Sequence, residues 1–291
     1  MGRFICSLAL GALAISVPAA LSAKETVLKQ SSPWNVDFAP EKCRLAAFYG
    51  EEDNRHLLFF EQHFPGEKAG MSVAGPAFKR FQSRKNTALQ FFAAQKPLTT
   101  KPFTGDMGEL GPAVIYSSVN LSTGTETRED KTPTSLPQLD TEFAKQVEYV
   151  SLTQRGTEIR LETGPLAEAF KVLNTCTQDM VTSWGLDLDQ HLSAQEMPKW
   201  TNEKQVARRI ARTYPSQALN RGEQAILRMR VIVDETGKVA DCVIDDATTT
   251  ERLESPACRE MRNARFNPAI GADGKPFKSF YATSITYQIG R

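Results

Sequence analysis

Two cysteines lie among acidic residues near the end of the chain, in the stretch DCVIDDATTTERLESPACRE. Cys242 and Cys258 have the right chemistry for a metal site, a reactive thiol or a disulfide. A zinc site needs four Cys or His ligands, usually with at least one closely spaced pair. These two cysteines are 16 residues apart, and the three histidines lie far away in the sequence. The spacing therefore predicts no metal site here.

The first residues, MGRFICSLALGALAISVPAALSA, have one basic residue followed by an uncharged, mostly apolar run that ends in small residues. This layout is typical of a secretory signal peptide, and we expect residues 1–23 to form one. The alternative is an inner-membrane anchor, because residues 5–23 are just long enough to span a bilayer. Pro18 and the weakly hydrophobic Ala, Ser and Gly content favour cleavage. We therefore expect the protein to be periplasmic.

Four cysteines remain after removal of such a signal peptide: Cys43, Cys176, Cys242 and Cys258. An even number of cysteines in an exported chain indicates two disulfides, because the periplasm is oxidising. Four cysteines allow three different pairings.

Motifs that would indicate an enzyme are missing from the sequence. A catalytic thiol needs a base nearby and usually an unpaired cysteine, whereas the even cysteine count leaves none over. The chain has no GxSxG or HExxH motif, and the glycines of GDMGELG (105–111) have the wrong spacing for a nucleotide-binding loop. We therefore predict that the protein is not an enzyme and binds no cofactor. The alternative is an exported enzyme whose activity lies in residues 33–185.

The length and composition predict two globular domains. A chain of 291 residues is long for one domain, and 41% hydrophobic and 24% charged residues are ordinary globular values. The formal net charge of +1 gives the chain no strong overall field. Export disfavours a nucleic acid as partner.

Residues 33–185 predict a β-rich α+β domain of unknown function, closed by a long helix. After a short polar entry, short apolar and β-branched runs predict strands, and EYVSLTQRGTEIRLETG predicts a hairpin around its Arg-Gly turn. Apolar residues then recur at helical spacing from Pro165 to a stop at Gly185. Residues 186–200 are short and polar, as expected of an interdomain linker.

Residues 201–291 predict the order helix, strand, strand, helix, strand. NEKQVARRIART gives the first helix, which must end before Pro215. QAILRMRVIVDETGKVADCVIDD predicts a hairpin, Ser255 and Pro256 begin the second helix, and SFYATSITYQI is a final alternating strand.

This order resembles the C-terminal domain of the TonB family. The matching elements are YPSQAL (214–219), RVIVDETGKVADCVI, ARFNPA (264–269), DGKP (273–276) and the closing strand. The resemblance covers about residues 201–291. It implies a small antiparallel three-stranded sheet packed on two helices, in the periplasm of Gram-negative bacteria.

The resemblance also implies a way of binding partners. Domains of this family recognise a short extended segment of outer-membrane transporters by adding it as a strand to a sheet edge, where backbone hydrogen bonds give the affinity. In this chain we expect the edge to be the final strand, with four candidate binding residues: Tyr281, Thr283, Ile285 and Tyr287.

The predicted elements also select one cysteine pairing. Cys242 lies on the second strand of the last domain and Cys258 in the first turn of the helix that covers it. Cys43 and Cys176 would then join the start of the first domain to its long helix. We therefore predict the disulfides Cys43–Cys176 and Cys242–Cys258.

These predictions favour a non-catalytic periplasmic protein that binds an envelope or outer-membrane protein. The alternative is a membrane-anchored energy transducer for outer-membrane transport, which would need a retained anchor and a long Pro-rich spacer. The 16 prolines of this chain are dispersed instead. A second expected partner is an anionic cell-wall or membrane surface, because six arginines lie on or beside the last two helices: Arg208, Arg209, Arg212, Arg259, Arg262 and Arg265.

Overall fold

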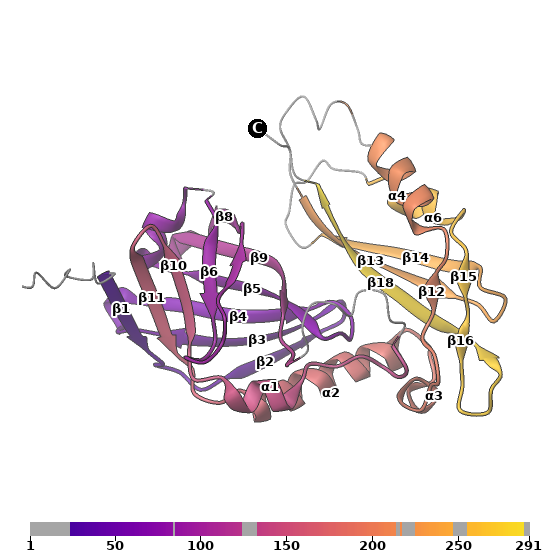
Figure 1. Ribbon diagram of the computed structural model, residues 1–291, viewed down its shortest axis with the longest axis horizontal. Coiled ribbons are helices and arrows are strands. Elements are labelled where there is room, and N and C mark those ends of the chain that lie inside the picture. Colours follow the sequence, from indigo (N-terminus) through magenta and orange to yellow (C-terminus); the bar gives the residue numbers. More distant parts are fainter. Residues whose placement is uncertain are drawn as a thin grey trace, which may run out of the picture.

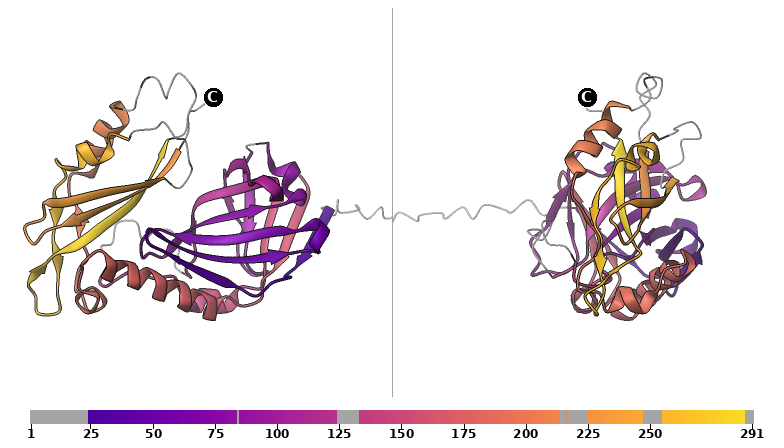
Figure 2. Two further views of the ribbon diagram at one scale, coloured as in Figure 1. Left: turned by 180° about the vertical axis from the view of Figure 1, so that it is seen from behind. Right: turned by 90° about the vertical axis from the view of Figure 1, so that its right-hand side faces the viewer.

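The computed structural model describes residues 24–83, 85–123, 133–213, 216, 225–246 and 255–287. It is a mixed α+β protein with many strands and few helices (Figure 1). The elements form two groups. The strands of the first group surround one core, and a smaller sheet with its helices forms the second group at the other end of a long helix (Figure 2).

A six-stranded antiparallel sheet forms one wall of the first group, in the order β2-β3-β4-β5-β9-β8. Its strands are β2 (Asn35–Ala39), β3 (Lys42–Tyr49), β4 (His56–Gln62), β5 (Lys68–Ala74), β8 (Phe103–Asp106) and β9 (Pro112–Asn120). Short 3-10 helices lie at Glu52–Asn54, Pro76–Phe81 and Gly108–Leu110. Strict alternation along β3 buries every second side chain, as expected of a strand with one face on a core.

The opposite wall is a five-stranded sheet in the order β1-β11-β10-β6-β7. Its strands are β1 (Lys24–Lys29), β6 (Thr87–Gln90), β7 (Leu98–Thr100), β10 (Val150–Gln154) and β11 (Thr157–Glu162). The β10–β11 hairpin matches the one predicted from its Arg-Gly turn. By contrast, the segment expected to be a polar entry forms β1, which pairs in parallel with β11.

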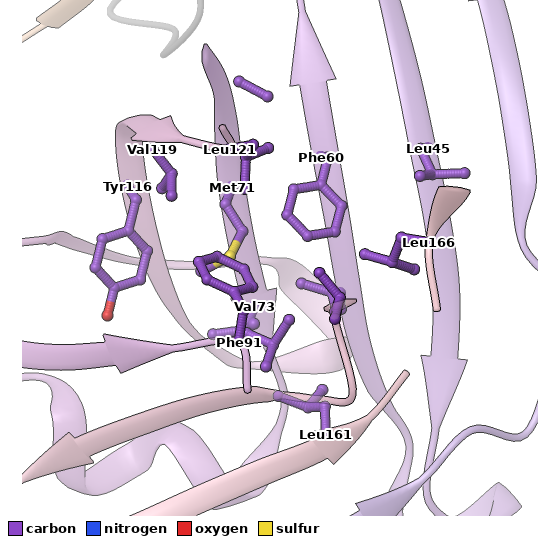
Figure 3. Packing of buried hydrophobic residues seen from close by; sticks show 14 of the residues in the cluster. Leu45, Phe60, Met71, Val73, Phe91, Tyr116, Val119, Leu121, Leu161 and Leu166 are labelled. Atoms are coloured by element: carbon purple, nitrogen blue, oxygen red, sulfur yellow. The ribbon is translucent and has the colours of Figure 1, made fainter. Parts of the chain in front are cut away.

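The main core lies between these two sheets. Aromatic and branched side chains from both walls meet there, among them Phe60 of β4, Met71 of β5 and Leu161 of β11 (Figure 3). The long helix α2 (Ala167–Ser183) packs on β3, and the short helix α1 (Thr141–Gln146) lies beside it (Figure 1). Asp140 caps α1 by accepting hydrogen bonds from the backbone N–H groups of Glu142 and Phe143.

The second group is built on a sheet in the order β14-β13-β18, with both neighbours antiparallel to the central strand. Its strands are β13 (Ala225–Val233), β14 (Val239–Asp246) and β18 (Ser279–Tyr287). The helices α4 (Glu203–Arg212) and α6 (Ala257–Met261) cover one face through a cluster that includes Val206, Met229 and Met261. Short paired segments complete the group: β12 (Lys199–Trp200), β15 (Phe266–Asn267), β16 (Ala269–Ile270) and β17 (Pro276–Phe277).

The segment expected to be a plain linker takes part in the packing. Residues 186–200 contain α3 (Leu188–Leu192) and β12, and they bury Leu186, Ala194 and Met197. These side chains join Val181 of α2 and Phe280 of β18 in a cluster between the two groups. The two groups are therefore held together by an apolar contact as well as by the chain.

Candidate functional site

The last strand, β18, lies at one edge of its sheet. It pairs with β13 from Ser279↔Val233 to Tyr287↔Ala225, a continuous antiparallel ladder. In the strand order of the described residues, no further strand follows β18 on its other side. The outward backbone groups of such a strand are a template for another extended chain.

The side chains of β18 alternate between the helices and the first group. Tyr281 and Ile285 pack against the cluster under α4 and α6. The Tyr281 ring lies 5.6 Å from that of Trp200 and 5.2 Å from that of Phe266, and burial raises the pKa of Tyr281 to about 12. Two of the four candidate binding residues therefore anchor the strand to its own helices.

The other two candidate residues are Thr283, between Tyr281 and Ile285, and Tyr287 at the end of the strand. Thr283 is partly exposed and contributes to a pocket beside the first group. Tyr287 is the last residue of β18, and its side chain lies outside the part of the chain that can be described. A partner that binds here would meet mainly the backbone of β18, so the assignment of these residues as a binding edge stays a prediction.

A groove of about 580 Å³ opens beside the first residues of β18. Its walls come from three regions that are far apart in the sequence: 64–68, 133–138 with Met197 and Pro198, and 280–282. The lining includes Phe64, Pro65 and Leu136, which belong to none of the sequence motifs. No local pattern could have selected them, because their shared feature is a position in space.

The face of the sheet opposite the helices is turned toward the first group. His191 of α3 lies there, buried, with its Nε2 2.9 Å from the Ser279 hydroxyl and its ring stacked on Phe280. Burial lowers the pKa of His191. The Arg230 guanidinium lies 4.2 Å from the centre of the Trp184 ring at the end of α2. These contacts combine apolar area with specific polar partners.

Disulfides join Cys43 to Cys176 and Cys242 to Cys258, with Cα–Cα distances of 5.9 Å and 5.6 Å. This is the predicted pairing. The first disulfide links β3 to α2 across the main core, and the second links β14 to α6. Each bond therefore fastens a sheet to the helix that covers it.

The six arginines expected to form a basic surface lie on or next to α4 and α6. Arg209 is half-buried and lies 3.8 Å from Glu260, which is also 3.8 Å from Arg259. The other five, including Arg259, are exposed to solvent. Surface ion pairs of this kind contribute little to stability. An anionic partner for this surface stays a prediction.

Membrane-spanning helices and metal-binding clusters are both absent from the described residues. Within them, no helix has the length and apolar character needed to cross a bilayer. The same part of the chain holds no group of three or more His, Cys, Asp and Glu side chains arranged to bind a metal ion.

Comparison with known proteins finds a similarity for the last part of the chain. No curated protein matches the sequence. Residues 210–289 match the family model described as Gram-negative bacterial TonB protein C-terminal, which spans β13, β14, α6 and β15 to β18. The match confirms the predicted resemblance: residues 210–289 are similar to the C-terminal domain of Gram-negative bacterial TonB proteins.

Proposed function

We propose that this protein is a non-catalytic periplasmic protein that binds an extended segment of an envelope or outer-membrane protein. The segment adds as a new strand along the free edge of β18. The observation that carries this proposal is the position of β18 at the edge of the sheet in a domain that matches an envelope interaction family. Two disulfides support an oxidising compartment.

The support of β18 by its own sheet favours strand addition over recognition by loops. Nine residue pairs hold β18 to β13, and Tyr281 fixes it to the helix-side cluster. An edge held in this way is ordered before the partner arrives, so less conformational entropy is lost on binding. Backbone hydrogen bonds along the edge supply affinity, and pockets for alternate side chains supply selectivity.

The groove beside β18 gives the proposed partner a direction. It lies at the Phe280–Ala282 end of the strand, and its walls include Phe64, Pro65 and Leu136. A segment added along β18 would place apolar side chains at this end. The preferred segment is therefore extended, with at least one large apolar residue where it passes Phe280.

Synthetic peptides from the N-terminal segments of outer-membrane transporters test the proposal. We expect a subset to bind the oxidised full-length protein in fluorescence anisotropy. Hydrogen–deuterium exchange of the complex should then show new protection of the amides of β18, while those of β14, at the other edge, stay unchanged. Protection confined to β14, or binding with no new protection of β18, contradicts strand addition.

A pair of proline substitutions sharpens the test. Neighbouring residues of a strand point their N–H groups to opposite sides, so one of Ala282 and Thr283 donates toward β13 and the other toward the free edge. Proline removes that donor. The edge-side variant should stay folded and lose peptide binding, whereas its neighbour should lower the free energy of unfolding. Equal binding by the edge-side variant argues against the proposal.

A further inference from the structure

A second pocket, of about 390 Å³, lies between the two groups of elements. Its walls come from β4 and the turn after it, from β5 and β9, and from the side of β13 and β18 that faces away from α4 and α6. The volume is within the usual range for small-molecule sites. Its polar side chains include Glu61, His63, Lys68, Ser118, Arg228 and Ser284.

Arg228 of β13 is the central cation of this pocket. Its side chain reaches across to the first group and donates from Nη2 to the Ser117 carbonyl oxygen at 2.7 Å, while Nη1 donates to the Ser284 hydroxyl. The residue is only 8% exposed, and burial lowers its pKa. An arginine held this deeply keeps its charge and needs an anion to offset the cost of desolvation.

The first group is shaped to receive this guanidinium. The β5–β9 ladder shifts register between Ala69 and Met71, so that Ser117 and Ser118 of β9 oppose Gly70 alone. The bulge frees the Ser117 carbonyl oxygen for Arg228. A Cβ at Gly70 would lie 3.1 Å from Nη2 of Arg228, so the missing side chain leaves space for the guanidinium.

The charge of Arg228 is offset only in part. Glu61 is the carboxylate whose charge acts on Arg228. That carboxylate already accepts from Arg44 Nε at 2.8 Å and from His63 Nε2 at 3.1 Å, and Lys42 Nζ lies 3.7 Å away. One carboxylate therefore faces several cations: Arg228, Arg44 and Lys42.

Three buried polar atoms of the lining residues are without a partner among the described residues: Nε of Arg228, Nδ1 of His63 and Oε1 of Gln62. The Gln62 amide donates from Nε2 to the carbonyl oxygens of Gly66 and Lys68, which leaves its Oε1 as an acceptor. Arg228 has five N–H donors, of which the two serine contacts use two. The pocket thus offers donors for an anion and an acceptor for a hydrogen-bond donor.

We propose that this pocket binds a small carboxylate that also carries an N–H or O–H donor, such as an N-acylated amino acid. The free donors of Arg228 bind the carboxylate, because the planar guanidinium matches its geometry. Gln62 Oε1 accepts from the donor group of the ligand. The pocket borders β18 at Ala282, Thr283 and Ser284, but side chains hold the ligand, so its binding does not depend on strand addition.

Isothermal titration calorimetry on the oxidised full-length protein tests the proposal with three probes. N-acetylalanine has both groups and should bind saturably with one site. N-acetylalaninamide lacks the carboxylate and should bind at least tenfold more weakly. Inorganic phosphate tests whether any oxyanion suffices. Absence of binding by N-acetylalanine, or tighter binding by phosphate or by the amide, overturns the proposal.

Three variants locate the binding. Arg228→Lys keeps the positive charge but lacks the planar guanidinium, so it should weaken N-acetylalanine binding about tenfold or more. Ser118→Tyr adds bulk at an exposed position of the pocket wall and should abolish binding while the protein stays folded. Arg230→Gln is the matched control, because it removes a cation of β13 that lies on Trp184 and does not line the pocket.

The affinities of the three variants distinguish binding in this pocket from binding elsewhere. Loss of binding in Arg228→Lys and Ser118→Tyr together with unchanged affinity in Arg230→Gln supports the site. Unchanged affinity in Ser118→Tyr, which places the ligand elsewhere, overturns it. Thermal unfolding midpoints measured without ligand show that each variant is folded, so a loss of binding is not mistaken for a loss of structure.

Discussion

Glu61 is the residue where burial and charge compete most directly. Burial by itself raises the pKa of its carboxyl group, because it disfavours the charged form. The hydrogen bond from His63 and the charge and hydrogen bonds of Arg44 act in the opposite direction and hold the pKa at about 2. The lowering of the pKa by these partners exceeds the effect of burial because Glu61 lies directly opposite Arg44 in the β3–β4 register.

This low pKa predicts an acid dependence of stability. A carboxyl group whose pKa is lower in the folded than in the unfolded state stabilises the protein above its unfolded pKa and loses that contribution as pH falls. For Glu61 the loss falls between about pH 4.5 and about pH 2. Glu61→Gln should lower the free energy of unfolding by ~2 kcal/mol at pH 7. It should also flatten this pH dependence, as measured by urea unfolding at several pH values.

A matched control comes from an exposed carboxylate. Glu168 of α2 pairs with Lys171 but is 85% exposed, so Glu168→Gln should leave stability and its pH dependence unchanged. If the Glu61→Gln curve runs parallel to that of the unmodified protein below pH 4.5, the charge cluster does not stabilise the fold in this way.

At the scale of the element, the β13–β14 turn depends on one glycine. Gly237 has φ +78°, and a Cβ there would lie 2.0 Å from the carbonyl oxygen of Phe266. That close approach lets the Phe266 N–H donate to the Gly237 carbonyl oxygen at 2.9 Å. The turn therefore docks onto β15 through the backbone, which explains why DETGK carries its glycine at this position.

Gly237→Ala should destabilise the protein by more than about 2 kcal/mol, because it combines a left-handed backbone with a clash against backbone atoms. Gly274→Ala is the control: its φ is +75°, but nothing lies within 4 Å of the added Cβ. Its cost should be about 1 kcal/mol, from the backbone alone. Guanidinium unfolding followed by tryptophan fluorescence measures both. Equal losses would show that the contact with Phe266 contributes nothing.

Element order could largely be predicted, whereas pairing between distant elements could not. The β10–β11 hairpin and α2 follow from turn residues and helical spacing close together in the sequence. β1 was not predicted, because its residues KETVLK carry weak strand signals and become a strand by parallel pairing with β11. Arg160 of β11 also forms an ion pair with Glu25 of β1 at 3.2 Å.

At the scale of the whole molecule, the two disulfides constrain very different lengths of chain. Cys43 and Cys176 are separated by 133 residues, and Cys242 and Cys258 by 16. In the chain-entropy model the longer loop stabilises by ~5 kcal/mol and the shorter by ~3 kcal/mol, because each bond restricts the unfolded state in proportion to the logarithm of loop length.

Removal of the long-range disulfide should therefore be the more damaging change. We expect Cys43→Ala with Cys176→Ala to lower the free energy of unfolding by up to ~5 kcal/mol, and Cys242→Ala with Cys258→Ala by up to ~3 kcal/mol. Chemical unfolding of the two double variants, compared with the oxidised protein, measures both losses. A larger loss from the Cys242–Cys258 pair would mean that native packing, rather than loop entropy, sets the order.

The sequence by itself determined the element order of the last domain and its family resemblance. These features depend on hydrophobic periodicity and turn residues, which are properties of nearby residues. Only the tertiary structure decided that Tyr281 faces the helices and that Arg228 reaches Ser117, 111 residues away. Such contacts depend on how distant surfaces pack, because a side chain's partner is set by shape and charge complementarity in space rather than by spacing along the chain.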